Sequence, residues 1–186
     1  MPSLPPRRAA AIVLAGLLTL LAGCGPGKDE FAPVCPRADL LRQAADIGRY
    51  RDESASATQD IRDLVLSGRI MAISGKCQAG DSAKQLAADV AVSMRFTRGP
   101  AMQGRETDVL FFLAITAGDE IFTKKVYQVH VVFPANIDQV TWTSDPVHMV
   151  FPISPTKSGA AYTVLAGFQL TEQELAFNRR HGGGRP

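Results

Sequence analysis

The clearest hydrophobic pattern in the chain is the alternation over residues 86–96, where every second position is apolar. Leu86, Val90, Val92 and Phe96 fall on one side of this pattern, and small, polar or charged residues fill the positions between. Successive side chains of a β-strand point to opposite faces, so a period of two predicts a strand with one face in the core.

Residues 109–116 show a different pattern, because they are apolar at nearly every position. Such a run is typical of a central strand that is covered on both faces. Residues 117–119, with Gly at their centre, supply a turn, and a further strand-like run covers residues 121–133. We therefore predict a β-hairpin made of these two strands.

Shorter runs bounded by Gly, Pro, Asp, Asn or Ser predict the remaining strands. About eight short strands at spacings near ten residues are typical of an antiparallel β-sandwich, and we predict a sandwich of the immunoglobulin-like type. A small lipocalin-like barrel uses similar strand patterns and is the alternative. The shorter predicted strands cover residues 60–66, 69–76, 139–143, 147–153 and 161–170.

The start of the predicted domain has a helical rather than a strand-like spacing. Leu40, Leu41 and Ala44 recur near a period of 3.6, and Gly48 follows as a stop. We therefore predict a short N-terminal helical segment within residues 36–49.

The end of the chain has a helix signal followed by a tail. Thr171 and Glu174 have the spacing of a capping box, which predicts a turn of helix running to Phe177. Residues 179–186 contain three consecutive glycines, and we predict that they form a disordered tail.

The N-terminus has the three parts of an export signal. Arg7 and Arg8 form the positive region, an apolar core covers residues 9–21, and small residues precede a possible cleavage site. The core has roughly half to two thirds of the ~20 residues that a membrane-spanning helix needs. We therefore predict a signal peptide over residues 1–23.

The apolar core ends in Leu21-Ala22-Gly23-Cys24, which resembles the lipobox of bacterial lipoprotein precursors. The resemblance covers residues 1–24 and implies cleavage before Cys24, with lipid, including palmitate, attached to that cysteine. It also implies a location in the cell envelope, and Gly25 favours the periplasmic face of the outer membrane over the inner membrane. An ordinary signal peptide that leaves Cys24 as a plain thiol or half of a disulfide is the alternative.

Residues 24–34 contain two glycines and two prolines and predict a flexible tether. The eleven residues from Cys24 to Cys35 span at most ~40 Å when fully extended. The predicted domain, residues 35–178, should therefore lie close to the membrane surface. Its length suits a single domain with a substantial core.

The charge balance argues against nucleic acid as a partner. The formal net charge is +2 for the whole chain, and it becomes 0 when Arg7 and Arg8 are removed with the signal peptide. Binding to a phosphate backbone usually requires a basic stripe, and no long run of one sign is present in the sequence.

Two further cysteines, Cys35 and Cys77, remain after lipidation of Cys24. An exported protein meets oxidising conditions, so we predict that these two form a disulfide. A metal site and a free nucleophilic thiol are the alternatives, but neither cysteine lies in a Cys-x-x-Cys motif or close to a histidine.

Candidate catalytic residues are few. The alternation places His130 with Gln128 and Val132 on the polar side of its strand, and His148 lies three residues after Asp145, so those two side chains point to opposite faces. Motifs for an acylating serine, a zinc protease or a phosphate-binding loop are absent from the sequence. We therefore predict neither a catalytic residue nor a metal site nor a cofactor.

Trp142 lies in a strand between two threonines, which is typical of half-buried packing and, less often, of an exposed contact. Together with His130 and His148 it defines a possible binding surface. Lys124 and Lys125 are predicted to form a solvated strand end.

The preferred function is a non-catalytic envelope lipoprotein that binds a protein partner. The alternatives are a carrier of a lipid or another apolar molecule and an envelope hydrolase.

Overall fold

The computed structural model describes residues 33–51 and 60–181, and Pro33–Pro186 form one compact unit. The predicted signal peptide and Cys24 lie outside the described residues, together with most of the tether and residues 52–59 and 182–186. Within the described ranges, no helix is both long enough and apolar enough to cross a bilayer.

Nine strands account for most of the described chain, which confirms the prediction of a mainly β protein. In chain order the elements are β1 (Arg37–Leu40), η2 (Arg42–Ala44), β2 (Asp46–Tyr50), η3 (Ile61–Asp63), β3 (Leu64–Ala79), β4 (Gln85–Arg98), β5 (Glu106–Ala117), β6 (Glu120–Val132), β7 (Gln139–Thr143), β8 (Val147–Pro152), η4 (Gly159–Ala161), β9 (Thr163–Phe168) and α2 (Glu172–His181), where η denotes a 3-10 helix.

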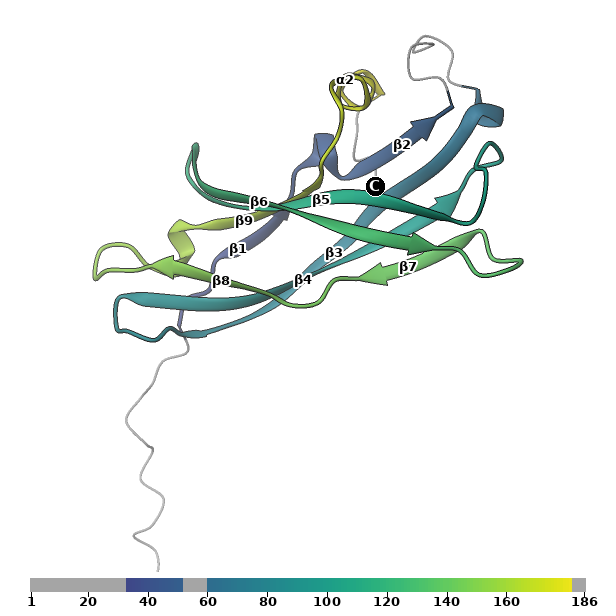
Figure 1. The fold of residues 1–186 in the computed structure, drawn as a ribbon. Helices are drawn as coiled ribbons and strands as arrows, with labels where there is room; N and C mark the ends of the chain where they lie inside the picture. Colours follow the sequence, from purple (N-terminus) through teal and green to yellow (C-terminus); the bar gives the residue numbers. More distant parts are fainter. Residues whose placement is uncertain (1–32, 52–59, 182–186) are drawn as a thin grey trace, which may run out of the picture. The chain divides into compact units, whose positions relative to one another are not determined.

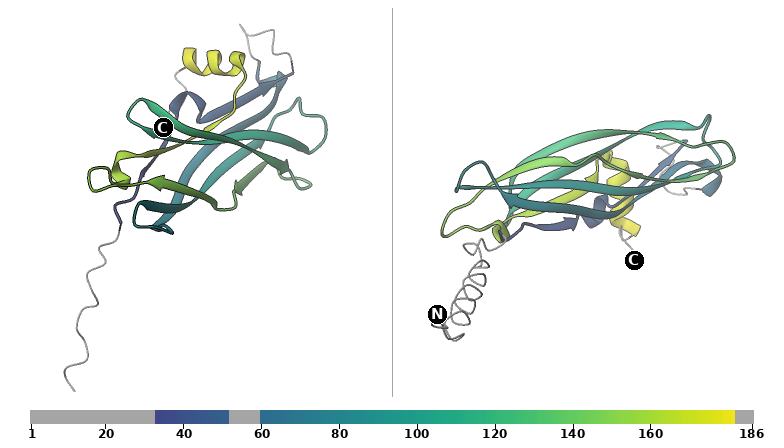
Figure 2. Two further views of the ribbon diagram at one scale, coloured as in Figure 1. Left: turned by 60° about the vertical axis from the view of Figure 1, so that its left-hand side comes forward. Right: turned by 90° about the horizontal axis from the view of Figure 1, so that it is seen from below.

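The strands form two sheets that lie face to face as a sandwich rather than a closed barrel (Figures 1 and 2). Sheet A has the order β1-β9-β5-β6, and sheet B has the order β2-β3-β4-β7, with β8 also paired to β4. Among the described strands, all pairings are antiparallel except that of β1 with β9, which is parallel. The sandwich prediction is therefore confirmed, and the barrel alternative is wrong.

The core lies between the inner faces of the two sheets. The alternating residues of β4 point into it as predicted: Val92, Met94 and Phe96 are fully buried, whereas Arg95 between them is exposed. The hairpin of β5 and β6 also forms as predicted, and Gly118 at its turn adopts a φ of +58°, which suits glycine.

Two predicted strands, residues 60–66 and 69–76, prove to be parts of one long strand, β3, that begins at Leu64. Gly68 lies inside this strand instead of in a turn. A Cβ atom there would lie 2.8 Å from the ring of Phe96 and 2.9 Å from Ile47, so the glycine makes room for two core side chains. Residues 61–63 form the 3-10 helix η3, which precedes the strand.

The predicted N-terminal helical segment, residues 36–49, is wrong. This stretch forms β1, the single turn η2 and β2, and so passes from sheet A to sheet B. Ala44 in η2 packs against Phe112 and Ala114 on the outer face of sheet A. Apolar residues near helical spacing therefore serve a strand-turn-strand crossover here.

The capping box at the C-terminal helix forms as predicted. The backbone N–H of Glu174 donates to Thr171 Oγ1 at 3.2 Å, and the N–H of Thr171 donates to Glu174 Oε2 at 2.7 Å. The helix continues to His181, beyond the predicted end at Phe177 and into the predicted tail. Buried Asn178 donates to the backbone carbonyls of Gln43 at 2.9 Å and Asp46 at 2.8 Å, which fixes α2 to the N-terminal crossover.

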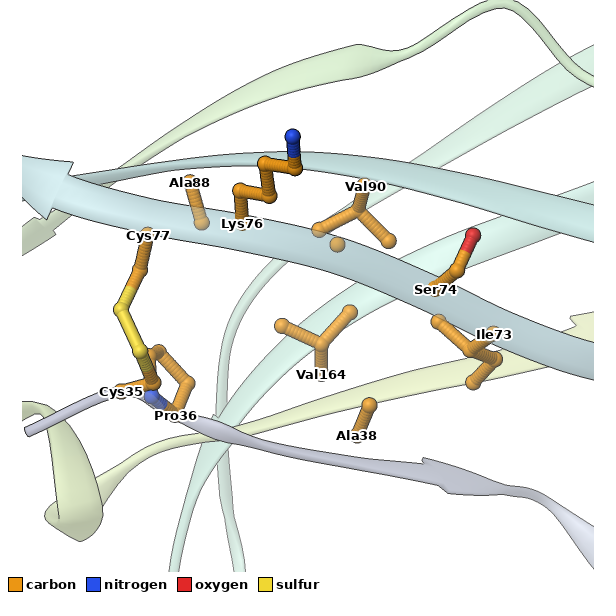
Figure 3. A pocket seen from close by; sticks show the side chains of 11 residues that line it. Cys35, Pro36, Ala38, Ile73, Ser74, Lys76, Cys77, Ala88, Val90 and Val164 are labelled. Atoms are coloured by element: carbon orange, nitrogen blue, oxygen red, sulfur yellow. A yellow bond between two sulfur atoms is a disulfide. The ribbon is translucent and has the colours of Figure 1, made fainter.

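The predicted disulfide between Cys35 and Cys77 is present, with the two Cα atoms 5.8 Å apart. Figure 3 shows the bond between the chain that leads into β1 and the far end of β3. Because β1 belongs to sheet A and β3 to sheet B, the bond joins the two sheets at one edge of the sandwich.

Candidate binding site at the β6 edge

Strand β6 forms one edge of sheet A, because within the described chain it pairs with β5 alone. Its inward-facing residues change character along the strand. Val131 and Val129 are buried, Tyr127 is half-buried, and Lys125 and Thr123 are exposed. All five side chains face the interior. They occupy every second position of β6, and the middle of this row is fixed by the pairing of Tyr127 with buried Phe111 and of Lys125 with buried Leu113 on β5.

The inward-facing lysine and tyrosine line a lateral pocket, an opening of about 270 Å³ between β6 and β8. Its innermost residues are apolar and buried, and its outer residues are exposed. The lining consists of Leu113, Ile115, Thr123, Lys125, Tyr127, Val147, His148, Met149 and Val150.

The polar groups of the lateral pocket are hydrogen-bond donors. Among the described residues, neither the Lys125 ammonium nor the Tyr127 hydroxyl forms an ion pair or hydrogen bond. Burial raises the pKa of Tyr127, so its hydroxyl remains a proton donor at neutral pH. The pocket lining contains no carboxylate. Its electrostatics therefore favour a negatively charged or acceptor group.

His148 stands beside the pocket with an acidic partner. Its Nδ1 lies 2.8 Å from Oδ1 of Asp89, which is directly opposite on β4. The side chain of His148 is 59% exposed. The partner is therefore a residue on the neighbouring strand and not Asp145, which precedes His148 in the chain.

Trp142 is half-buried and packs against the core, which is the more common of the two roles weighed from the sequence. Its ring lies edge-on to the Phe111 ring, with the ring centres 6.0 Å apart, and the Phe111 ring stacks on that of Tyr127 with the centres 5.3 Å apart. The only tryptophan of the chain is thus linked through one aromatic ring to the wall of the lateral pocket.

His130 lies elsewhere, on the outer face of sheet A. Its Nδ1 is 2.8 Å from Asp108 Oδ1, and its Nε2 is 3.6 Å from Glu106 Oε2. The hydrogen bond to Asp108 is the main reason that the pKa of His130 is raised, and the same bond lowers the pKa of Asp108. Since His148 belongs to sheet B, the two histidines do not form one site.

Lys124 and Lys125 are not a solvated strand end, because both lie inside β6. Lys125 faces the lateral pocket, whereas Lys124 faces the outer side, where its Nζ lies 4.4 Å from the centre of the Phe112 ring and donates to Gln169 Oε1 at 2.9 Å. The two neighbouring lysines therefore have different surroundings.

Two other hollows are weaker candidates. The one beside the disulfide has about 100 Å³ and a mostly apolar lining that includes Ala38, Val90 and Val164 (Figure 3). The other has about 450 Å³ and lies open on the outer face of sheet B, where Arg69 is already paired with Asp46 at 2.5 Å.

Sequence reasoning singled out His148 and Trp142, which the structure places at the lateral pocket and next to it. It missed Lys125 and Tyr127. One sequence signal was available. The residues on this face of the strand are valine and tyrosine at positions 129 and 127, but lysine and threonine at positions 125 and 123. The facing strand β8 could not be assigned without the fold.

No family model matches the chain, and the searches of curated proteins and of solved structures also gave no match. In the described ranges, no group of three or more His, Cys, Asp or Glu side chains is arranged to hold a metal ion.

Proposed function

We propose that this protein is a lipid-anchored, non-catalytic module of the bacterial cell envelope that binds an extended segment of a partner protein along β6. The lipobox-like residues before Cys24 support the anchor, and Gly25 supports the periplasmic face of the outer membrane. The short tether keeps the domain near the membrane, so the partner has to reach it there.

The observation that carries the proposal is the free edge of β6. This strand is 13 residues long and leaves one row of backbone N–H and C=O groups without a strand partner in the described part of the chain. Such an edge is a template for a further strand from another chain. Ile121, Val126 and Val132 are also exposed along it, with 64%, 48% and 53% of their surface accessible.

The lysines of β6 supply selectivity. Charged residues on an edge strand oppose pairing with arbitrary strands, including the same strand of a second copy. A partner strand with a carboxylate opposite Lys124 would instead gain a favourable contact. We therefore expect the bound segment to be extended and acidic near this position.

Site-specific photocrosslinking in intact cells tests the proposal. A crosslinking residue at Val126 should give a discrete adduct, because Val126 lies on β6. The matched control is Met71, which is 42% exposed but belongs to β3 of sheet B. Lys124→Glu should reduce the Val126 adduct; equal adducts from both positions, or none from Val126, would refute β6 as the binding edge.

The anchor has a separate test. Cys24→Ala should abolish lipidation and leave an unprocessed or mislocalised chain, because the lipid is attached to this side chain. Normal processing and unchanged partition into membranes would contradict the lipoprotein assignment, whatever the crosslinking result.

A carrier of small apolar molecules is the second candidate function. It is favoured by one specific observation, the partly apolar lateral pocket of about 270 Å³ between β6 and β8. The core between the sheets is filled by side chains, so a carrier would have to hold its ligand at the edge of the sandwich.

A further inference from the structure

The lateral pocket combines an apolar interior with a cationic outer part. Leu113, Ile115 and Met149 are at least nine-tenths buried and form its inner surface. Lys125 and His148 are exposed and lie on β6 and β8, the two strands that supply most of the lining. Going from inside to outside, the lining therefore changes from apolar side chains to the Lys125 ammonium.

The position of Lys125 is unusual for a lysine. It pairs with Leu113, whose side chain is 1% exposed, and so it occupies an inward-facing position of the sandwich. Lysine is almost never fully buried without a partner, and Lys125 meets this rule because its side chain is exposed at the open edge of the sandwich. The described residues supply no carboxylate within ion-pair distance of it.

An inward-pointing lysine also protects an edge strand against aggregation, and this role would explain a charge at this position. It does not explain the adjoining hollow, nor the hydroxyl of half-buried Tyr127, which has no hydrogen-bond partner among the described residues. A hollow, an ammonium and a free hydroxyl donor together are the components of a ligand site.

We propose that the lateral pocket binds a single-chain amphiphile with a carboxylate head group, the acyl chain lying on Leu113, Ile115 and Met149 and the carboxylate next to Lys125 and Tyr127. A carboxylate accepts hydrogen bonds from both groups. The volume of about 270 Å³ lies just below the range of about 300 to 1,000 Å³ for ligand pockets, so the chain is a short or medium one. This proposal names the ligand of the second candidate function and does not rest on the binding of a partner along β6, although β6 borders both sites.

Decanoate is a suitable probe, and decanol, which has the same chain without the charge, is its control. The protein for this test is residues 33–186, which form a compact unit. Titration calorimetry measures binding directly, and the emission of Trp142 reports it because Phe111 connects this ring to Tyr127. We expect saturable binding of decanoate and at least about tenfold weaker binding of decanol, since a charge-assisted hydrogen bond is lost.

Lys125→Met keeps the length of the side chain and removes its charge. We expect it to weaken decanoate about tenfold and to leave decanol unchanged. Lys124→Met is the matched control, because Lys124 is the next residue but faces the outer side. It should leave decanoate binding unchanged.

A third variant, Val147→Phe, tests the location by filling the pocket from β8. It should weaken decanoate and decanol together. The proposal is overturned if decanoate does not bind, if it binds no better than decanol, or if Lys124→Met and Lys125→Met have equal effects. Loss of photocrosslinking at Val126 would contradict the partner-binding proposal and leave this one standing.

Discussion

Removal of the Cys35–Cys77 disulfide should lower the free energy of unfolding by about 4 kcal/mol. The bond closes a loop of 42 residues. In the chain-entropy model, a crosslink across a loop of this length removes about 13 cal/mol/K from the unfolded ensemble, or about 4 kcal/mol at 25 °C. The loop contains β1, η2, β2, η3 and most of β3, so the crosslink constrains parts of both sheets.

The double variant Cys35→Ala/Cys77→Ala in residues 33–186 is the perturbation. Urea unfolding followed by Trp142 emission is the assay, because this half-buried ring is the only tryptophan. With a slope of about 2 kcal/mol/M, a loss of about 4 kcal/mol moves the midpoint by about 2 M. The unfolded chain also expands when the crosslink is lost, so the slope should rise.

The wild-type chain treated with a thiol reductant is the control, and its midpoint should fall to that of the double variant. A loss of less than about 1 kcal/mol in the free energy of unfolding would refute this prediction, because the unfolded chain would then gain little conformational entropy when the disulfide is removed. A large loss in the double variant without one in the reduced wild type would trace the effect to the alanines.

Three further results follow from contacts in the fold. An NMR titration should give His130 a pKa above the ordinary histidine value, and Asp108→Asn should return the pKa of His130 towards the ordinary value. The pair therefore stabilises the fold when the pH is below the ordinary histidine pKa. This stabilisation is lost as the pH rises through the raised pKa of His130. Asn178→Ala should cost about 1–3 kcal/mol in urea unfolding, because it removes the donor of two hydrogen bonds to backbone carbonyls, and an unchanged midpoint would contradict the docking role of α2. Gly68→Ala should cost about 1–3 kcal/mol through overpacking against Phe96, and a stabilised variant would show that the ring can move aside at no cost.

The strands that the sequence predicts best are those with an unambiguous period. Residues 86–96 alternate because one side of β4 is buried and the other exposed, and this relation does not depend on the rest of the fold. The stretch around Gly68 was misread because glycine is common both in turns and at crowded positions in strands. Only the neighbours Ile47 and Phe96, which are distant in sequence, decide between the two.

The N-terminal crossover and the site were harder to predict for the same reason. Ala44 is apolar because it covers Phe112, which is 68 positions away, and a local pattern cannot distinguish this from a helix face. Lys125 could be placed on the same face as Tyr127 by counting residues. That this face borders an opening follows from the pairing of β8 with β4, which no local pattern contains.

The parallel pairing of β1 with β9 has a consequence for the order in which the molecule can fold. Arg37 pairs with Thr163, so 126 positions of chain separate neighbours in sheet A. Since β9 also lies between β1 and β5, the sheet has a gap at its centre until nearly the whole chain is available. Contacts this distant make folding slow. A nascent chain would thus keep its first strand unpaired while most of the domain is made, and premature release or truncation before Thr163 would leave β1 with no sheet to join.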